Sequence, residues 1–168
     1  MKPLLISPLS LQSLNTFFDN FDFSEDSEHI KKYISFIKEA TFCYQNIIHK
    51  FYSALEDEIV GFVVLSTKSV DEITGIFIEF LYLKPKYRNK MNEITDTKYS
   101  YFLLDYVIKI AIKIQKEVAI NHIYLVPIND KVRIVYQEYG FENIPNSGNN
   151  GFEDYMVFNL LEEDATIF

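Results

Sequence analysis

The sequence IFIEFLYLKPKYR at residues 76–88 decides the fold, because it joins a strand-like run to a turn and an arginine. Residues 76–83 are apolar and rich in β-branched and aromatic side chains, a composition typical of a buried strand. Pro85 cannot donate a backbone hydrogen bond to a ladder, so we expect the strand to end near Leu83. We therefore predict that residues 76–83 form the central strand of a sheet.

Glu79 is the one charged residue within this strand. A carboxylate that is buried without a partner is costly, so its presence indicates either a role in chemistry or a hidden partner. Two interpretations stay open: a general base, or a carboxylate paired with a lysine or tyrosine across the sheet.

The composition suits a single globular domain over residues 1–168. The chain is 48% hydrophobic and 24% charged, and 15 Phe and 12 Tyr with no Trp predict a core built on aromatic rings. The only cysteine, Cys43, excludes an intrachain disulfide. The three histidines lie far apart with no second ligand at metal-binding spacing, so we expect no metal site.

The charge pattern and the hydropathy limit the classes of partner that the chain can bind. No stretch reaches the ~18 apolar residues of a membrane span, and Pro and Ser interrupt the N-terminal residues MKPLLISPLS, so we expect a cytoplasmic protein that binds no membrane. The net charge of -8 repels phosphate backbones, which argues against nucleic acid. The sequence leaves a homodimer open.

Periodicity and turn residues predict the other elements. Before the central strand we expect an edge strand at 4–7, a short helix after Ser10, an acidic loop at 19–26, a helix capped by Ser24 or Ser27, a hairpin of strands 47–55 and 59–66, and a polar loop at 67–72. After it we expect a polar stretch beyond Arg88, a helix at 97–117 with lysines outside, a strand at 122–126, a helix from Asn129 or Asp130 to Gly140, a loop at 145–151 and a strand at 155–160. Gly61 indicates a bulge or a close backbone approach. This order predicts an α+β (mixed α/β) fold, a sheet flanked by helices.

Two motifs carry a family resemblance. The first is LYLKPKYR at 81–88, and the second places Asn129, Tyr136 and Gly140-Phe141 on and after one helix. Together with the element order, they resemble the GNAT acetyltransferase superfamily, whose members move an acetyl group from acetyl-CoA to an amine. The resemblance covers nearly the whole chain. It implies a mostly antiparallel sheet of six to seven strands, splayed after residue 83 and flanked by about four helices.

The resemblance also implies how acetyl-CoA would bind as the cosubstrate, without a metal. Main-chain groups of Leu81, Tyr82 and Leu83 and the side chain of Asn129 would bind pantetheine, whereas Arg88, Lys90 and Ser100 would face the pyrophosphate. The family loop of the form Arg/Gln-x-x-Gly-x-Gly/Ala has no counterpart here, since residues 88–100 contain no glycine. Because glycine lets a backbone approach phosphate closely, we expect either weak CoA affinity or a cofactor held mainly by pantetheine contacts and side-chain cations. We also expect this loop to be mobile without ligand. Asn129 as a helix N-cap and Arg88 as a solvated surface residue remain the plain alternatives.

The implied chemistry is direct attack of an amine on the thioester, with Glu79 as general base and Tyr136 as general acid. A tyrosine at the edge of the core is the plain alternative for Tyr136. The acceptor would be a small-molecule or peptide amine. The sequence FDF at 21–23 loosely resembles the branch of tRNA-acetylating toxins, which the negative net charge disfavours. In another class, the chain would be a GNAT-fold binding or regulatory module that has lost acetyl-CoA.

Overall fold

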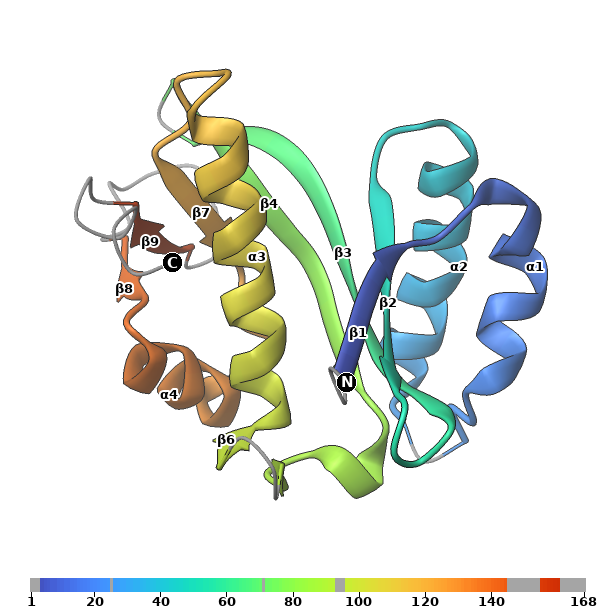
Figure 1. Cartoon of the computed structure of the whole chain (residues 1–168). Coiled ribbons are helices and arrows are strands. Elements are labelled where there is room, and N and C mark those ends of the chain that lie inside the picture. Colours follow the sequence, from blue (N-terminus) through green and yellow to red (C-terminus); the bar gives the residue numbers. More distant parts are fainter. Residues whose placement is uncertain (1–3, 25, 71, 93–95, 145–154, 161–168) are drawn as a thin grey trace. The chain divides into compact units, whose positions relative to one another are not determined.

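The computed structural model describes residues 4–24, 26–70, 72–92, 96–144 and 155–160. Figure 1 shows how the described helices and strands follow one another along the chain. Their bounds are β1 Leu4–Pro8, η1 Leu11–Ser13, α1 Leu14–Phe17, η2 Phe18–Asn20, α2 Glu28–Phe42, β2 Ile47–Ser53, β3 Glu58–Val70, β4 Ile73–Leu83, η3 Pro85–Tyr87, β5 Met91–Asn92, β6 Thr97–Lys98, α3 Tyr99–Gln115, β7 His122–Leu125, α4 Asp130–Tyr139, β8 Glu142–Asn143 and β9 Met156–Asn159.

The chain divides into two compact units. Unit 1 comprises Met1–Ser66 and Phe80–Leu103, and unit 2 comprises Thr67–Glu79 and Leu104–Phe168. Strands β3 and β4 and helix α3 each contribute residues to both units. A single domain over residues 1–168 stays our prediction.

One sheet of seven strands has the order β1-β2-β3-β4-β7-β9-β8, and β5 and β6 form a separate two-stranded sheet. The pairings β1–β2, β2–β3, β7–β9 and β8–β9 are antiparallel, and β4–β7 is parallel. This mixed, mostly antiparallel sheet with helices confirms the predicted fold class.

The parallel pairing of the central strand is short. It joins Ile76 to Ile123, Phe77 to Tyr124 and Ile78 to Leu125, whereas β4 itself continues to Leu83. The pairing covers only part of β4, in agreement with the predicted splayed sheet, and it ends at Ile78 rather than at residue 83. The physical reason is that β7 is only four residues long and ends at Leu125.

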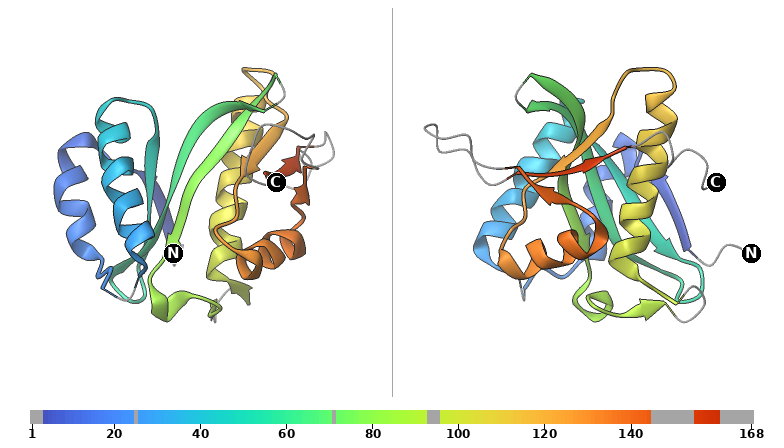
Figure 2. Two further views of the ribbon diagram at one scale, coloured as in Figure 1. Left: turned by 180° about the vertical axis from the view of Figure 1, so that it is seen from behind. Right: turned by 90° about the vertical axis from the view of Figure 1, so that its left-hand side faces the viewer.

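Unit 1 has an aromatic core, as the composition predicted. Figures 1 and 2 show α1 and α2 side by side on one face of strands β2 and β3. The buried residues of this core are Leu14, Phe17, Phe18, Phe21, Ile34, Ile37, Ile48, Phe62, Val64 and Tyr82. Gly61 explains why β3 and β4 fit so closely, since a Cβ at this position would lie 2.3 Å from the Tyr82 carbonyl oxygen. The expected close approach at Gly61 is confirmed, and the β2–β3 register also shifts between Phe51 and Tyr52.

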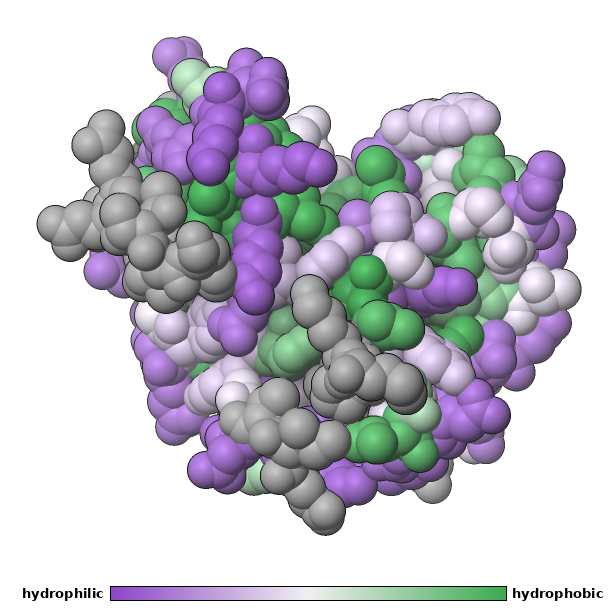
Figure 3. All heavy atoms as spheres, in the orientation of Figure 1, coloured by the Kyte–Doolittle hydropathy of each residue, from purple (hydrophilic) through white to green (hydrophobic). Residues whose placement is uncertain are grey.

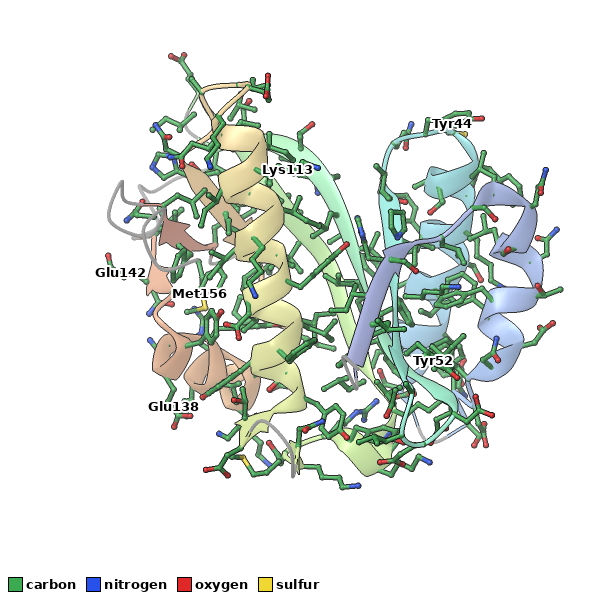
Figure 4. The ribbon with its side chains drawn as sticks, viewed as in Figure 1. Tyr44, Tyr52, Lys113, Glu138, Glu142 and Met156 are labelled. Atoms are coloured by element: carbon green, nitrogen blue, oxygen red, sulfur yellow. The ribbon has the colours of Figure 1, made fainter. Side chains whose placement is uncertain are left out.

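Unit 2 is built from the end of β3, the first part of β4, the C-terminal part of α3, helix α4 and strands β7 to β9. Val107 of α3, Ile123 and Leu125 of β7 and Met156 of β9 are all buried, and Figure 4 shows the position of Met156. The outer face of α3 carries the expected lysines, of which Lys113 is exposed and labelled in Figure 4. Figure 3 shows hydrophilic side chains along this helix in the same orientation.

Several sequence-based boundaries were wrong. The predicted polar loop at 67–72 is mostly strand, because β3 extends to Val70 and leaves Thr67, Lys68 and Ser69 exposed. Within the polar stretch after Arg88, β5 and β6 pair as antiparallel strands, and Asn92 is buried. Strand β8 was not predicted. The predicted loop at 145–151 lies outside the described residues.

Within the described part of the chain, no helix is long and apolar enough to cross a membrane. The same residues contain no group of three or more His, Cys, Asp or Glu side chains that could hold a metal ion.

Candidate functional site

The end of β4 in unit 1 is held by its side chains. Tyr82 is buried, and its hydroxyl donates a hydrogen bond of 2.7 Å to Oδ2 of Asp26. Burial, together with the Asp26 carboxylate, raises the pKa of Tyr82 well above its usual value. The backbone continues into a turn in which the Lys84 amide donates to the Val60 carbonyl at 2.9 Å. Leu81, Tyr82 and Leu83 are therefore placed on a strand end that is anchored from one side by β3.

Arg88, expected to meet phosphate, has partners within unit 1. Its Nε donates to the Leu83 carbonyl at 2.9 Å, and its Nη2 donates to Oδ1 of Asp26 at 3.0 Å. The guanidinium carbon lies 5.1 Å from the ring centroid of Tyr82, a cation–π distance. The structure thus joins Arg88 to Tyr82 and Leu83, two of the residues predicted with it.

The neighbouring cations are paired as well. Tyr87 is fully buried, and its hydroxyl donates to Glu56 at 2.5 Å and to Glu58. Lys84 bonds Glu58 at 3.0 Å, Lys86 also bonds Glu58, and Lys90 lies 3.4 Å from Glu56.

Glu58 shows the strength of this network. Its burial alone would raise the pKa, but hydrogen bonds from Lys86, Tyr87 and Lys84 outweigh that effect and lower the pKa to about 2.

In the glycine-free loop, a residue other than glycine adopts a backbone conformation that glycine usually provides. Asn89 adopts a φ of 60°, in the left-handed region that asparagine tolerates better than most residues. The Lys90 carbonyl accepts a hydrogen bond of 3.2 Å from the Tyr99 amide at the start of α3. Ser100 is the second residue of this helix, so Lys90 and Ser100 both belong to the segment around its N-terminus.

In unit 2, Glu79 has the cross-strand partner that was the alternative to a catalytic role. Its Oε2 lies 3.0 Å from Nζ of Lys68 on β3, and 12% of its side chain is exposed. The Lys68 ammonium also lies 3.9 Å from the ring centroid of Phe77. Lys68 is itself 44% exposed, so this ion pair is open to solvent from the lysine side.

Helix α4 carries the motif with Asn129 and Tyr136. Asn129 caps the helix, because its side-chain oxygen accepts a hydrogen bond of 3.0 Å from the Val132 amide. Gly140 has a φ of 117°, and the Phe141 amide donates to the Tyr136 carbonyl at 2.9 Å, so the expected left-handed helix end is confirmed. Because they are seven positions apart, close to two helical turns, Asn129 and Tyr136 lie on one side of the helix.

Tyr136 is half-buried, with its ring centroid 5.7 Å from that of Phe141. Burial raises the pKa of its hydroxyl to about 12. Among the residues that the structure describes, its hydroxyl has no hydrogen-bond partner. The group is therefore protonated at neutral pH.

Sequence reasoning missed the partners of these residues. Asp26 and Lys68 come from parts of the chain that were interpreted as solvated, and Glu56 and Glu58 were assigned only to a polar turn. One signal was present, since the acidic turn at 56–58 and the basic run at 84–90 have complementary charges.

Comparison with known proteins identifies the fold. No protein-family model matches the chain, and no curated protein matches it in sequence. Solved structures do match over nearly its whole length, among them GNAT acetyltransferases. The chain therefore has the fold of the GNAT acetyltransferase superfamily, which confirms the fold implied by the resemblance in its sequence.

Three of these proteins give the scale of the similarity. The AtaTR complex bound with AcCoA has a TM-score of 0.68 and 14% identity, covering 95% of both chains. The KacTA–DNA complex has a TM-score of 0.68 and 13% identity, covering 94% of this chain and 93% of the other. A spermidine N-acetyltransferase SpeG chimera from Vibrio cholerae and hSSAT has a TM-score of 0.59 and 15% identity, covering 97% and 98%.

Nucleic acid accompanies some of these neighbours, since AtaT has also been solved with acetyl-methionyl-tRNAfMet. The negative charge that argues against nucleic acid is unevenly distributed in the present chain. Unit 1 carries 10 Lys and Arg against 11 Asp and Glu, whereas unit 2 carries 6 against 13. Most of the negative net charge therefore belongs to unit 2, and unit 1 is close to neutral.

Proposed function

We propose that this chain is an acyl-CoA-dependent N-acetyltransferase (EC 2.3.1.-) that transfers the acetyl group of acetyl-CoA to a primary amine. The observation that carries the proposal is helix α4 on a GNAT fold, with Asn129 at its start and the protonated Tyr136 two turns later. The neighbouring AtaTR complex bound with AcCoA and the spermidine N-acetyltransferase SpeG chimera support this class of reaction.

The proposed reaction is a direct attack. The amine nitrogen forms a bond to the thioester carbonyl carbon, and the bond from that carbon to sulfur breaks. The protonated amine first loses one proton to the general base Glu79, and the second proton that its nitrogen loses as the amide forms passes to water. The departing thiolate takes a proton from the general acid Tyr136, which regains one from water. The raised pKa of Tyr136 supports this assignment, because the hydroxyl carries its proton throughout the neutral range.

The ion pair of Glu79 with Lys68 is compatible with a role of Glu79 as the general base for a protonated amine substrate. Primary amines are protonated at neutral pH, so an arriving substrate carries the same charge as the Lys68 ammonium. It can replace Lys68 beside the carboxylate, and the solvent-open side of the pair gives the lysine room to leave.

The residues fit acetyl-CoA in part. The main chain of Leu81 to Leu83 would bind pantetheine, and Asn129 keeps its amide donors for the same purpose, since its cap uses only the oxygen. Lys90, Ser100 and the N-terminus of α3 would supply donors to the pyrophosphate. Asn89 and Asp96 provide two left-handed residues in a loop without glycine. We therefore still expect a Kd of tens of micromolar or worse, or about -6 kcal/mol.

The test is acetyl-CoA turnover measured by released thiol, with spermidine, a peptide N-terminus and methionyl-tRNA as acceptors. With a productive acceptor, we expect Glu79→Gln to lower the rate by about ten- to a thousandfold. Lys68→Met is the matched control, because it removes the partner and leaves the carboxylate, and we expect its rate to stay within about threefold. Equal losses in both variants would mean that the ion pair is structural and that Glu79 is not the base.

A second candidate is a GNAT-fold binding module without catalysis. The pairing of Lys84, Lys86, Arg88 and Lys90 with carboxylates supports it, because these cations already have partners. Calorimetry with acetyl-CoA separates the two candidates. Absence of binding at millimolar acetyl-CoA would favour the binding module.

A further inference from the structure

The loop before α2 reaches the end of the central strand through one acidic side chain. Asp26 is almost completely buried, with 2% of its side chain exposed. It accepts hydrogen bonds from the Tyr82 hydroxyl and from Nη2 of Arg88, one on each carboxylate oxygen. A buried carboxylate is stable only when such partners compensate for its lost hydration.

From this geometry we propose that Asp26 is a positioning residue that fixes Arg88 as a brace for the end of β4, where pantetheine is proposed to bind. This inference deepens the proposed function and rests on it. Arg88 then acts through its hydrogen bond to the Leu83 carbonyl, and it is not primarily a phosphate ligand.

The surroundings of Tyr82 make this arrangement rigid. The rings of Phe21 and Phe23, which precede Asp26 in the same loop, lie 5.7 Å and 5.2 Å from the Tyr82 ring. Arg88 covers the same ring at 5.1 Å. Tyr82 is therefore enclosed by the loop through its ring and its hydroxyl at once, so a displacement of the loop must displace the strand end.

The interactions of the Arg88 guanidinium argue against a role for Arg88 as a ligand of the cofactor phosphate. Three of its interactions, with Asp26, the Leu83 carbonyl and the Tyr82 ring, must be weakened before it can turn toward an anion. The two roles predict opposite effects of removing the Asp26 charge. If Arg88 is a brace, loss of the Asp26 charge weakens the brace and CoA binding. If Arg88 is a phosphate ligand, the same loss releases its guanidinium and strengthens CoA binding.

The experiment is calorimetric titration of CoA into the unmodified protein and into Asp26→Asn, Arg88→Lys and the double variant. Asp22→Asn is the matched control, because Asp22 is exposed in the same loop and its described hydrogen bond is with the Ser24 amide. We expect Asp26→Asn to raise the Kd of CoA by about five- to twentyfold, the usual size of coupling between sites. We expect Asp22→Asn to leave the Kd unchanged.

The double variant tests whether the two residues act as a unit. If they do, it binds CoA about as weakly as Asp26→Asn alone, because the second change removes an interaction already lost. Tyr82→Phe keeps the ring under Arg88 and removes one partner of Asp26, so it provides a milder variant should Asp26→Asn unfold. Its expected rise in Kd is about two- to fivefold.

Two results overturn the inference. An unchanged or lower Kd in Asp26→Asn would show that Arg88 competes for phosphate or that Asp26 does not act on the site. Additive losses in the double variant would show independent roles. Failure of the unmodified protein to bind CoA would overturn the proposed function itself and this inference with it.

Discussion

Segments 129–141 and 84–100 are both predicted to contact the cofactor, but they are held in place by different means. The hydrogen bonds that define segment 129–141 join residues three to five positions apart, such as Asn129 with Val132 and Tyr136 with Phe141. Segment 84–100 depends on distant partners, since Arg88 and Asp26 are separated by 62 positions and Tyr87 and Glu56 by 31. Local rules therefore build the two ends of the first segment, which also has one long-range hydrogen bond from Tyr139 to Asp105, whereas the described part of the second segment depends on the tertiary structure.

The largest effect expected in this comparison is on catalysis. Tyr136→Phe removes the proposed acid and should lower the rate of amine acetylation by about a hundredfold. The melting temperature should stay nearly unchanged, because the hydroxyl has no hydrogen-bond partner among the described residues. Kinetics with a productive acceptor, together with thermal unfolding, check both expectations.

Tyr139→Phe is the control on the same helix. The Tyr139 hydroxyl donates to Asp105 at 2.5 Å, so this change should lower stability by about 1 kcal/mol and leave the rate within about twofold. A rate loss of similar size in both variants would contradict a specific role for Tyr136.

The next largest effect should appear in the segment held by distant partners. Tyr87→Phe removes a buried hydroxyl whose single proton is shared between Glu56 and Glu58, and a hydrogen bond to a charged group contributes about 1.5–3 kcal/mol. We expect the free energy of unfolding to fall by about 2 kcal/mol in a urea titration. Tyr44→Phe is the control, because Tyr44 is 82% exposed, and it should change stability by less than about 0.5 kcal/mol.

Helix capping should produce a smaller and separable effect. Asn129→Ala removes the cap of α4 and should cost about 1 kcal/mol. Asn129→Asp keeps the capping oxygen and removes the amide donors, so stability should be retained while the Kd of acetyl-CoA rises. If Asn129→Ala lowers stability and neither variant changes the Kd of acetyl-CoA, Asn129 acts only as a helix cap and does not bind the cofactor.

The smallest effect expected is a dependence on pH. The pKa of Glu58 is lowered to about 2 in the folded protein, so its stabilising contribution is complete above the ordinary value of 4.5 and is lost as pH falls toward 2. Because a quarter of the side chain is exposed, we expect only about 0.5–1 kcal/mol. The unmodified protein should lose this amount relative to Glu58→Gln between pH 5 and about pH 2 in urea titrations.

The difference from Glu58→Gln also cancels contributions from other groups. One of these is His49, whose pKa is lowered to about 4 by burial.

The groups that cap segment 129–141 are a side-chain amide and backbone groups, which do not titrate. As the pH falls, amide signals of α4 in NMR spectra should therefore change less than those of residues 84–90. The reverse order would contradict the division into local and distant contacts.

The same division explains how much the sequence could predict. The ends of α4, the close approach at Gly61 and the strand–turn at Pro85 follow from rules that involve a few neighbouring residues, and the structure confirms them. The partners of Glu79 and Arg88 could not be predicted, because Lys68 and Asp26 meet them only after the sheet has formed. The extension of β3 to Val70 was missed because exposed polar residues in a strand resemble a loop.

Cys43 gives this chain a practical property of its own. It follows α2 as the C-terminal cap residue, it is exposed, and it is the only cysteine in the sequence. A thiol-reactive fluorophore will therefore label unit 1 at one position without any removal of native cysteines. A second cysteine in place of exposed Lys113 in unit 2 would complete a donor–acceptor pair, and the energy transfer would then report whether acetyl-CoA changes the distance between the two labels.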